Sequence, residues 1–244
     1  MLSRILYKAI RGSRFTYEKS SFKNFRRYIE GANKDVAGED LLCYMPQSEV
    51  LEFDHFDDKV QMISVTKCDG QEPTQEASLY CVFQALMKEQ GSKRVTGALS
   101  YDLRTFEGFD ATNVLGDVHT KIPFFSETGE DLATFRDRFD SCLAVYRKGI
   151  DLRWLATRKM GAHNAQVLST RWNTLNFSVN YLGMALDLED VLLNIKGIDF
   201  DYNFMNMFTY RDSMVCVIRQ RILKDSSYVI QSKGATYCLQ TSIE

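Results

Sequence analysis

Three histidines are the residues of this chain best suited to proton transfer, because an imidazole titrates near neutral pH and can act as a general base. They are His55 in the stretch EFDHFDD, His119 in DVHTKIP and His163 in GAHNAQ. None of them lies in a catalytic motif that the sequence alone makes recognisable. The sequence therefore assigns no catalytic residue and leaves the histidines as candidates without a role.

Acidic residues gather around His55 and raise the question of a metal site. They are Glu52, Asp54, Asp57 and Asp58. A hard cation needs several oxygen ligands that converge on one point. On an alternating strand, however, Glu52 and Asp54 would share one face and His55 would take the other. We interpret the group as the solvated tip of a hairpin and predict no metal site.

Composition argues against several further classes of function. The net charge of −2 provides no general attraction to nucleic acid, and no apolar run approaches the roughly 20 residues that span a bilayer. The sequence contains no zinc-ligand spacing, P-loop, dinucleotide-binding glycine motif or serine-hydrolase motif. Its six cysteines are scattered without a CxxC pair. We interpret them as small core residues of a protein in the reducing cytoplasm.

Two stretches carry polar residues and glycines in a more particular arrangement. In residues 95–124, VTGALSYDLRTFEGFDATNVLGDVHTKIPF, two strand-like runs flank a loop that contains Arg104, Leu115 and Gly116. In residues 175–183, LNFSVNYLG, the alternation of a strand places apolar and polar side chains on opposite faces. The polar face of this predicted strand carries Asn176, Ser178 and Asn180, and the stretch ends at Gly183.

Together these stretches resemble the second half of the condensation-domain and alcohol-acetyltransferase superfamily, the larger relatives of chloramphenicol acetyltransferase. In that family a buried strand ends in Arg, a Leu-Gly-Asn turn and a second strand follow, and a later strand ends in Asn-x-Leu-Gly. Arg104, Leu115-Gly116 and residues 180–183 match these motifs in the same order. Asp117 stands where the family commonly has the Asn of the turn, and it adds a charge there. The resemblance extends from about residue 20 to about residue 220.

The resemblance implies roles at the boundary between two lobes. Arg104 would form an ion pair with the Asp of a catalytic loop on the other lobe, while Gly116 and Gly183 would belong to the lobe interface. The substrate tunnel would be lined by Asn176, Ser178 and Asn180.

Local alternatives to these roles remain open. Asp102, Asp110 or Asp117 could pair with Arg104 within the chain itself, because an unpaired buried guanidinium is costly. The polar face of the strand at 175–181 could also be an ordinary solvent-exposed face. Both alternatives would leave the residues without a part in chemistry.

The catalytic signature of the family, His-x-x-x-Asp-Gly, belongs to its first half and does not occur in this sequence. The single-lobe chloramphenicol enzymes carry their catalytic His near the C-terminus, but the last 80 residues here contain no histidine. The resemblance thus implies a C-terminal lobe of an acyltransferase. It would transfer an acyl group from a CoA or carrier-protein thioester to an amine or alcohol only when combined with a lobe that supplies the His.

The same resemblance implies the partners. We expect no bound cofactor. The acyl donor would be a thioester carried by CoA or by the phosphopantetheine of a carrier protein, as in nonribosomal peptide synthetases. The expected partners are an N-terminal acyltransferase lobe or a carrier protein, and an isolated lobe is expected to self-associate. The alternatives are a non-catalytic protein-binding module derived from this fold and an unrelated α/β domain.

The elements that must position these residues follow from hydrophobic periodicity. We predict a basic N-terminal segment at 1–19, either a transit peptide or a short solvated helix, and a single domain at 20–244. Alternating helices and strands predict an α/β fold with a mixed sheet flanked by helices, one lobe of a chloramphenicol-acetyltransferase-like architecture. Helices are expected at 20–32, 74–90, 129–148 and 151–160, and strands at 95–103, 118–124 and 175–181. Hairpins are expected at 50–66 and 204–220. Residues 187–195 are either a short helix or a loop, and the tail from Lys224 is either helix or strand.

Overall fold

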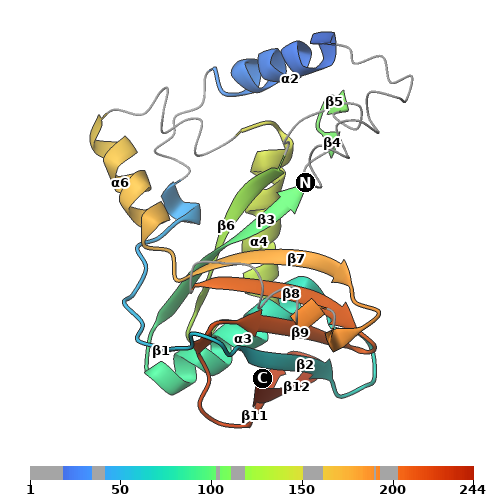
Figure 1. The fold of residues 1–244 in the computed structure, drawn as a ribbon. Coiled ribbons are helices and arrows are strands. Elements are labelled where there is room, and N and C mark those ends of the chain that lie inside the picture. The colour runs from blue at the N-terminus through green and yellow to red at the C-terminus, as the bar shows by residue number, and fades with distance from the viewer. Residues whose placement is uncertain are drawn as a thin grey trace.

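The computed structural model describes residues 19–34, 42–102, 105–110, 119–150, 162–189, 191–192 and 203–244. Within these residues, eight strands form one sheet in the order β11-β12-β2-β9-β8-β7-β3-β6 (Figure 1). The strands are β2 (Gln61–Lys67), β3 (Arg94–Asp102), β6 (His119–Glu127), β7 (Phe177–Met184), β8 (Phe204–Tyr210), β9 (Ser213–Ile218), β11 (Ser227–Ser232) and β12 (Ala235–Ile243). The predicted mixed α/β sheet is confirmed.

Pairing in this sheet is antiparallel except where β7 runs parallel to both of its neighbours, β3 and β8. The predicted hairpin at 204–220 is confirmed, and its turn places Arg211 at a φ of 54°. The ambiguous tail from Lys224 forms the antiparallel strands β11 and β12. The tail therefore completes the edge of the sheet.

The predicted hairpin at 50–66 is wrong. β1 (Asp54–His55) pairs instead with β10 (Gln220–Arg221), while β2 pairs with β9 and β12. The apolar residues Leu51 and Phe53 pack against the core from a loop rather than from a strand. Alternation thus detected which residues are half-buried, but it did not determine their hydrogen-bond partners.

Two helices cover one face of the sheet. They are α3 (Gln75–Gln90) and α4 (Leu132–Arg147). The helix predicted at 74–90 is α3; Thr74 caps it by accepting a hydrogen bond from the Ala77 amide, and Gly91 ends it in the left-handed conformation. The helix predicted at 129–148 is α4, and Asp131 caps its first turn. We call this side of the sheet the helix-covered face.

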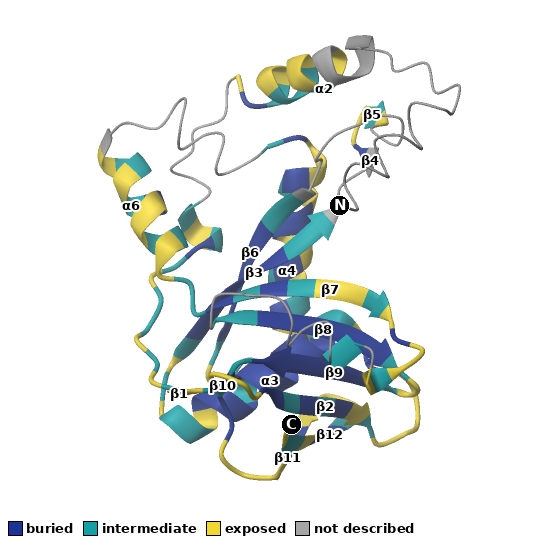
Figure 2. Cartoon of the chain, in the orientation of Figure 1, coloured by how far each residue is buried: buried dark blue, intermediate teal, exposed yellow. Residues whose placement is uncertain are grey.

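The main core lies between these helices and the sheet. Phe83 of α3 stacks on Phe124 of β6 and contacts Phe177 of β7, with ring centroids 5.5 Å apart in both pairs. Dark blue, buried residues accordingly fill the centre of β3, β8 and β9 in Figure 2. These contacts fix the central strands relative to the helices.

The opposite side, which we call the open face, is less apolar. A second and smaller core cluster lies on it, formed by Val60, Ala185, Phe208, Val215 and Val217. Strand register extends this face across β2 and β12 on one side and across β7, β3 and β6 on the other. The polar side chains of the predicted site belong to this face.

Two further helices lie away from the sheet (Figure 1). The predicted helix at 20–32 is α2 (Lys19–Ala32), whose Tyr28 stacks on Phe109 and donates a hydrogen bond to the Glu107 carbonyl at 2.7 Å. It thereby packs on a small hairpin, β4 (Thr105–Phe106) and β5 (Phe109–Asp110). The other helix, α6 (Ala162–Asn173), was not predicted. Residues 1–18 and the helix predicted at 151–160 lie outside the described residues.

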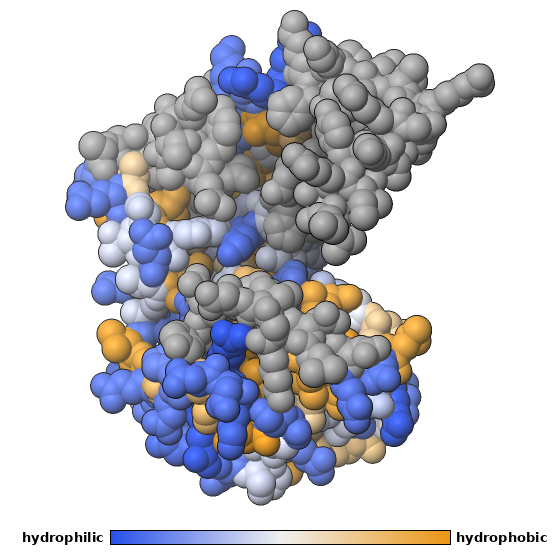
Figure 3. Space-filling model, viewed as in Figure 1, coloured by the Kyte–Doolittle hydropathy of each residue, from blue (hydrophilic) through white to orange (hydrophobic). Residues whose placement is uncertain are grey.

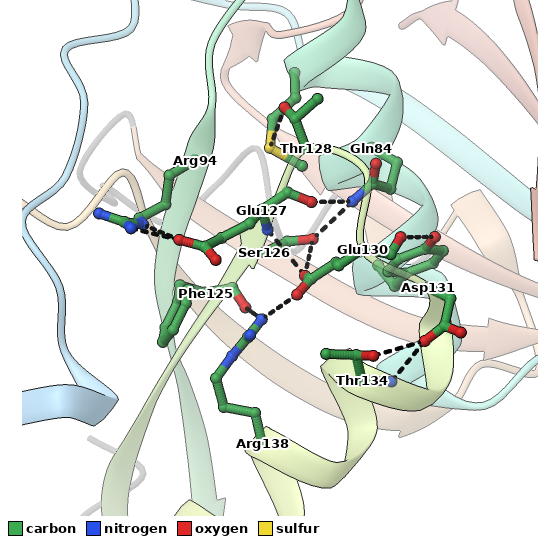
Figure 4. A network of polar contacts seen from close by, with 12 residues as sticks. Gln84, Arg94, Phe125, Ser126, Glu127, Thr128, Glu130, Asp131, Thr134 and Arg138 are labelled. Carbon is green, nitrogen blue, oxygen red and sulfur yellow. Dashed lines mark hydrogen bonds and ion pairs between the residues drawn. The ribbon is translucent and has the colours of Figure 1, made fainter.

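A polar network joins the end of β6 to both core helices (Figure 4). Glu130, whose side chain is 7% exposed, accepts hydrogen bonds from Ser126 Oγ at 2.8 Å and from Arg138 at 2.7 Å. Arg138 also donates to the Phe125 carbonyl and lies 3.8 Å over the Phe125 ring. Because every charged group in it has a partner, the network holds β6 in place without leaving a buried charge unpaired.

Candidate functional site

The three strands that carry the predicted motifs lie side by side. β3, which leads to Arg104, pairs with β6 on one side and runs parallel to β7 on the other, with Leu99 opposite Val179. Arg104 and Gly116 themselves lie outside the described residues, as do Leu115 and Asp117. The structure therefore brings the motif-bearing strands together and leaves the roles of Arg104 and Gly116 as predictions.

The predicted alternation of β7 is confirmed. Phe177 and Val179 are fully buried on the helix-covered face, whereas Ser178 and Asn180 are half-buried on the open face. Tyr181 is more exposed than its predicted apolar side suggested, and its hydroxyl lies 3.1 Å from Thr209 Oγ1. The strand thus presents a polar row opposite its core contacts.

Ser178 and Asn180 form the centre of this row. Lys121, on β6 across the intervening β3, reaches over the open face and donates a hydrogen bond from Nζ to Ser178 Oγ at 2.8 Å. The same ammonium group lies 5.9 Å from the Phe204 ring centroid. Asn180 is in register with Asn206 of β8. The row therefore combines a cation, a hydroxyl and amide groups, which suits hydrogen bonding to a polar substrate.

Asn176, at the start of the row, uses its side chain to hold three segments together. Its Oδ1 accepts hydrogen bonds from the Thr96 amide at 2.9 Å and from Thr96 Oγ1 at 3.0 Å. Its Nδ2 donates to the Glu49 carbonyl at 2.9 Å. These bonds fasten the loop around residue 49 to β3 and β7, so Asn176 has a positioning role in addition to any contact with substrate.

A cavity of about 820 Å³ lies next to Asn176. It is bounded by the 47–53 loop, by one side of α6 and by the residues that precede or follow the central strands. Its lining is mixed, with the polar residues Ser48, Glu49, Gln166, Asn203 and Gln220 beside the apolar Val50, Leu51, Phe53, Val167 and Leu175. Sequence analysis missed this cavity because it missed α6, in which few apolar residues mark a buried side.

The histidines are separated in space as well as in sequence. His163 is exposed at the start of α6 and lines the cavity. His55 is exposed on β1, with Nδ1 3.3 Å from Gln220 Nε2. His119 lies on β6, and its side chain is outside the described residues. The structure therefore adds a cavity position for His163 and assigns a catalytic role to none of them.

Gly183 lies where β7 departs from regular pairing, and its φ of +86° is one that residues with a Cβ rarely adopt. On either side of it the chain exposes apolar side chains: Leu182 is 48% exposed, Met184 72% and Leu186 93%. Figure 3 shows orange, apolar atoms at the right of the molecule, near the end of β7. We call these three residues the β7 apolar patch.

Among the described residues, no group of three or more His, Cys, Asp or Glu side chains is placed to hold a metal ion. The four acidic residues around His55 lie on β1 and in the loops beside it, and all four are exposed. No helix in the described part of the chain is long and apolar enough to cross a membrane.

Comparison with known proteins gives similarity at the level of structure. No family model matches the sequence, and no curated protein is significantly similar to it. The epimerization domain from the third module of tyrocidine synthetase B superposes with a TM-score of 0.52 at 13% identity, covering 85% of this chain and 54% of that domain.

Two further solved structures are less similar. PapA2 acyl transferase gives a TM-score of 0.44 at 10% identity, over 80% of this chain and 48% of its own. A condensation domain described in chain release from the enacyloxin polyketide synthase gives a TM-score of 0.43 at 11% identity. The match covers 77% of this chain and 42% of that one. The fold assignment rests on the first match alone, and the chain spans about half the length of the structures it matches. The fold is a mixed α/β sheet flanked by helices, as the sequence predicted, and it is similar to about half of that epimerization domain.

Proposed function

We propose that this chain is the C-terminal lobe of a condensation- or acetyltransferase-type acyltransferase. It would transfer an acyl group from a CoA or carrier-protein thioester to an amine or alcohol when a second lobe supplies the catalytic His. The observation that carries the proposal is the pairing of β3 with β7 (Phe177–Met184), which brings the strand leading to Arg104 beside the strand that carries Ser178 and Asn180. The similarity of the fold to part of an epimerization domain is consistent with it.

In this proposal the chain binds and positions rather than abstracts the proton. A general base must lie within hydrogen-bond reach of the nucleophile. Among the described side chains, His55 on β1 and His163 on α6 are exposed to solvent, and neither lies on the strands that carry Lys121, Ser178 and Asn180. The base would come from the second lobe, either on another chain or in another part of a longer one. The chain alone is expected to catalyse no transfer.

The residues of the open face then have distinct tasks. Ser178 and Asn180 would face the channel and offer hydrogen bonds to the substrate amide or hydroxyl. Asn176 would fix the channel wall through its bonds to Thr96 and Glu49. Arg104 would brace the catalytic loop of the other lobe through an ion pair with its Asp.

The test is to purify the tagged chain from its native extract and to assay what is recovered for acyl transfer from acetyl-CoA and from acylated carrier protein. A stoichiometric protein lobe with His-x-x-x-Asp-Gly, together with thioester-dependent transfer by the complex, is the expected result. Arg104→Ala should weaken assembly and activity together, while Cys43→Ser should change neither. Transfer by the chain alone, or a complex active without any such motif, would overturn the proposal.

A second candidate is a non-catalytic protein-binding module, favoured by the β7 apolar patch. Exposed apolar side chains of this kind mark interaction sites on soluble proteins when they are contiguous. Replacing Leu182, Met184 and Leu186 with Ser should abolish partner binding in either case. Only the acyltransferase proposal predicts that the partner contains the catalytic motif. Light scattering of the purified chain at high concentration tests the expected self-association, which a monomer would contradict.

A further inference from the structure

Two cysteines that are 170 residues apart in the sequence meet on the open face. Cys68 follows β2 and Cys238 lies on β12, and their Sγ atoms are 3.1 Å apart. The antiparallel register pairs Thr66 with Cys238, and the Cys68 amide donates to the Thr236 carbonyl at 2.9 Å. The two cysteines are therefore diagonal neighbours across adjacent strands, on one face of the sheet.

Both thiols are accessible from solvent. Cys68 is exposed and Cys238 is half-buried, whereas Cys81, Cys142 and Cys216 are buried. The sequence-based interpretation of all six cysteines as core residues is thus wrong for Cys43 and Cys68, which are exposed, and for Cys238, which is half-buried. For Cys68 and Cys238 the reason is that alternation cannot distinguish an open face of the sheet from a covered one.

We propose that Cys68 and Cys238 form a reversible disulfide when the protein meets a peroxide. The thiolate of one cysteine attacks the peroxide, breaks its O–O bond and becomes a sulfenic acid, with release of water or an alcohol. The sulfur of the second cysteine then displaces the sulfenic hydroxyl as water and forms the S–S bond. Each sulfur is oxidised by one electron, and the peroxide is reduced by two.

The position of the pair explains why the bond would be reversible. Diagonal neighbours have Cα atoms near the outer limit that a relaxed disulfide can bridge, so closure strains the strands. Strained and exposed disulfides have less negative reduction potentials and are the ones that dithiols reduce readily. A structural disulfide would be expected at a relaxed, covered position instead.

Formation of the bond would fasten the edge of the sheet. β12 lies between β11 and β2, so β11 and β12 are the two outermost strands at this edge. The link would close a loop of about 170 residues, which restricts the unfolded chain strongly. We expect oxidation to raise the melting temperature by about 5 °C or more.

The rate of oxidation should rise with pH. The hydrogen bond with Cys238, followed by partial burial, raises the pKa of the Cys68 thiol above its ordinary value. The attacking species is the thiolate, so a raised pKa makes the reaction slow at neutral pH and faster in alkali. The negative charge of Asp69 also raises the pKa of Cys68. Asp69 itself forms an ion pair with Lys67, with Nζ and Oδ2 2.5 Å apart.

The experiment treats the purified full chain with hydrogen peroxide, blocks the remaining thiols with an alkylating agent and maps the peptides by mass spectrometry. The expected product is a linked peptide pair containing Cys68 and Cys238, two hydrogen atoms lighter than the reduced pair and restored by dithiothreitol. Cys68→Ser and Cys238→Ser should each abolish this product and the rise in melting temperature. Cys43→Ser, at another exposed cysteine, should leave both unchanged.

Three outcomes would overturn the proposal. They are a disulfide between other cysteines, formation of dimers only, and oxidation of Cys68 or Cys238 to sulfinic acid without a linked product. Because serine replaces each sulfur by a similar atom at an accessible position, both variants should fold, and their melting temperatures under reducing conditions verify this.

Discussion

On the helix-covered face of the sheet, phenylalanine rings from α3, β6 and β7 stack in a fully buried core. On the open face, β6 and β7 present Lys121, Ser178 and Asn180, which are half-buried, and one hydrogen bond joins Lys121 to Ser178. One strand, β7, therefore belongs to both environments in alternate residues. Burial of aromatic surface makes the first face the main source of stability. The second face buries the smaller cluster around Phe208, but its polar row at Ser178 and Asn180 buries less apolar surface and contributes less to stability.

The comparison teaches that substitutions on the two faces should separate stability from function. A change on the helix-covered face removes packing from a core that cannot collapse freely. A change on the open face removes one hydrogen bond or exposes one group to water. Neighbouring residues in the sequence can thus have very different effects.

The largest difference is expected between Phe177 and Ser178. Phe177→Ala should lower the free energy of unfolding by about 3–5 kcal/mol, because it leaves a cavity beside Phe83 and Phe53. Ser178→Ala should lower it by about 1 kcal/mol or less, since it removes only the bond from Lys121. Urea unfolding of both variants measures the difference. Equal effects would show that the faces do not differ as described.

Two glycines extend the comparison. A Cβ at Gly97 would lie 2.7 Å from the Phe124 ring on the helix-covered face, so Gly97→Ala should cost about 2 kcal/mol through overpacking. At Gly183 nothing lies within 4 Å, and only the left-handed backbone opposes a side chain. Gly183→Ala should cost about 1 kcal/mol. Thermal unfolding compares them, and a larger loss at Gly183 would contradict the packing argument.

Asn176 is the open-face residue for which we expect the clearest stability effect. Asn176→Ala should lower the free energy of unfolding by about 1.5 kcal/mol, because the Thr96 amide and the Glu49 carbonyl lose their partner. Asn176→Asp keeps the acceptor for Thr96 and should recover part of this loss. Chemical denaturation with amide exchange at Thr96 checks the result. An unchanged exchange rate in Asn176→Ala would show that the bond is not formed in solution.

The smallest effect concerns thiols. Burial raises the pKa of Cys142 and of Cys216 to about 12, and it raises the pKa of Cys81 as well. The pKa of each buried thiol is higher in the folded than in the unfolded state. The contribution of these thiols to the free energy of unfolding is therefore fully present below the ordinary thiol pKa of 9.0. It is lost as pH rises from about 9 to about 12.

The measurement is the denaturation midpoint at a series of alkaline pH values, with Cys216→Val as the variant whose decline should be shallower. Thiol labelling of the native protein sharpens the comparison of faces. Cys68 and Cys238 should react well before the buried cysteines. Rapid labelling of Cys216 in the folded state would contradict its assigned burial.

Local pattern predicted the helices α3 and α4, the strands β3, β6 and β7 and the hairpin of β8 and β9, because their apolar periodicity matches the faces they bury. It failed at residues 50–56, where alternating apolar residues pack from a loop, and at α6, which has a weak periodic signal. Asn176 and Ser178 were predicted as site residues. Their partners Thr96, Glu49 and Lys121 were not, because these contacts join positions that are far apart in the chain.

The sequence by itself determined the order of the elements and the alternation of β7, since both depend on neighbours within a few residues. It also established that this chain lacks His-x-x-x-Asp-Gly. Only the tertiary structure decided which strands are adjacent, where the cavity lies and which cysteines meet. Those features depend on the register and crossovers of the sheet, which bring Cys68 to Cys238 across 170 residues. No local periodicity records a contact over that distance.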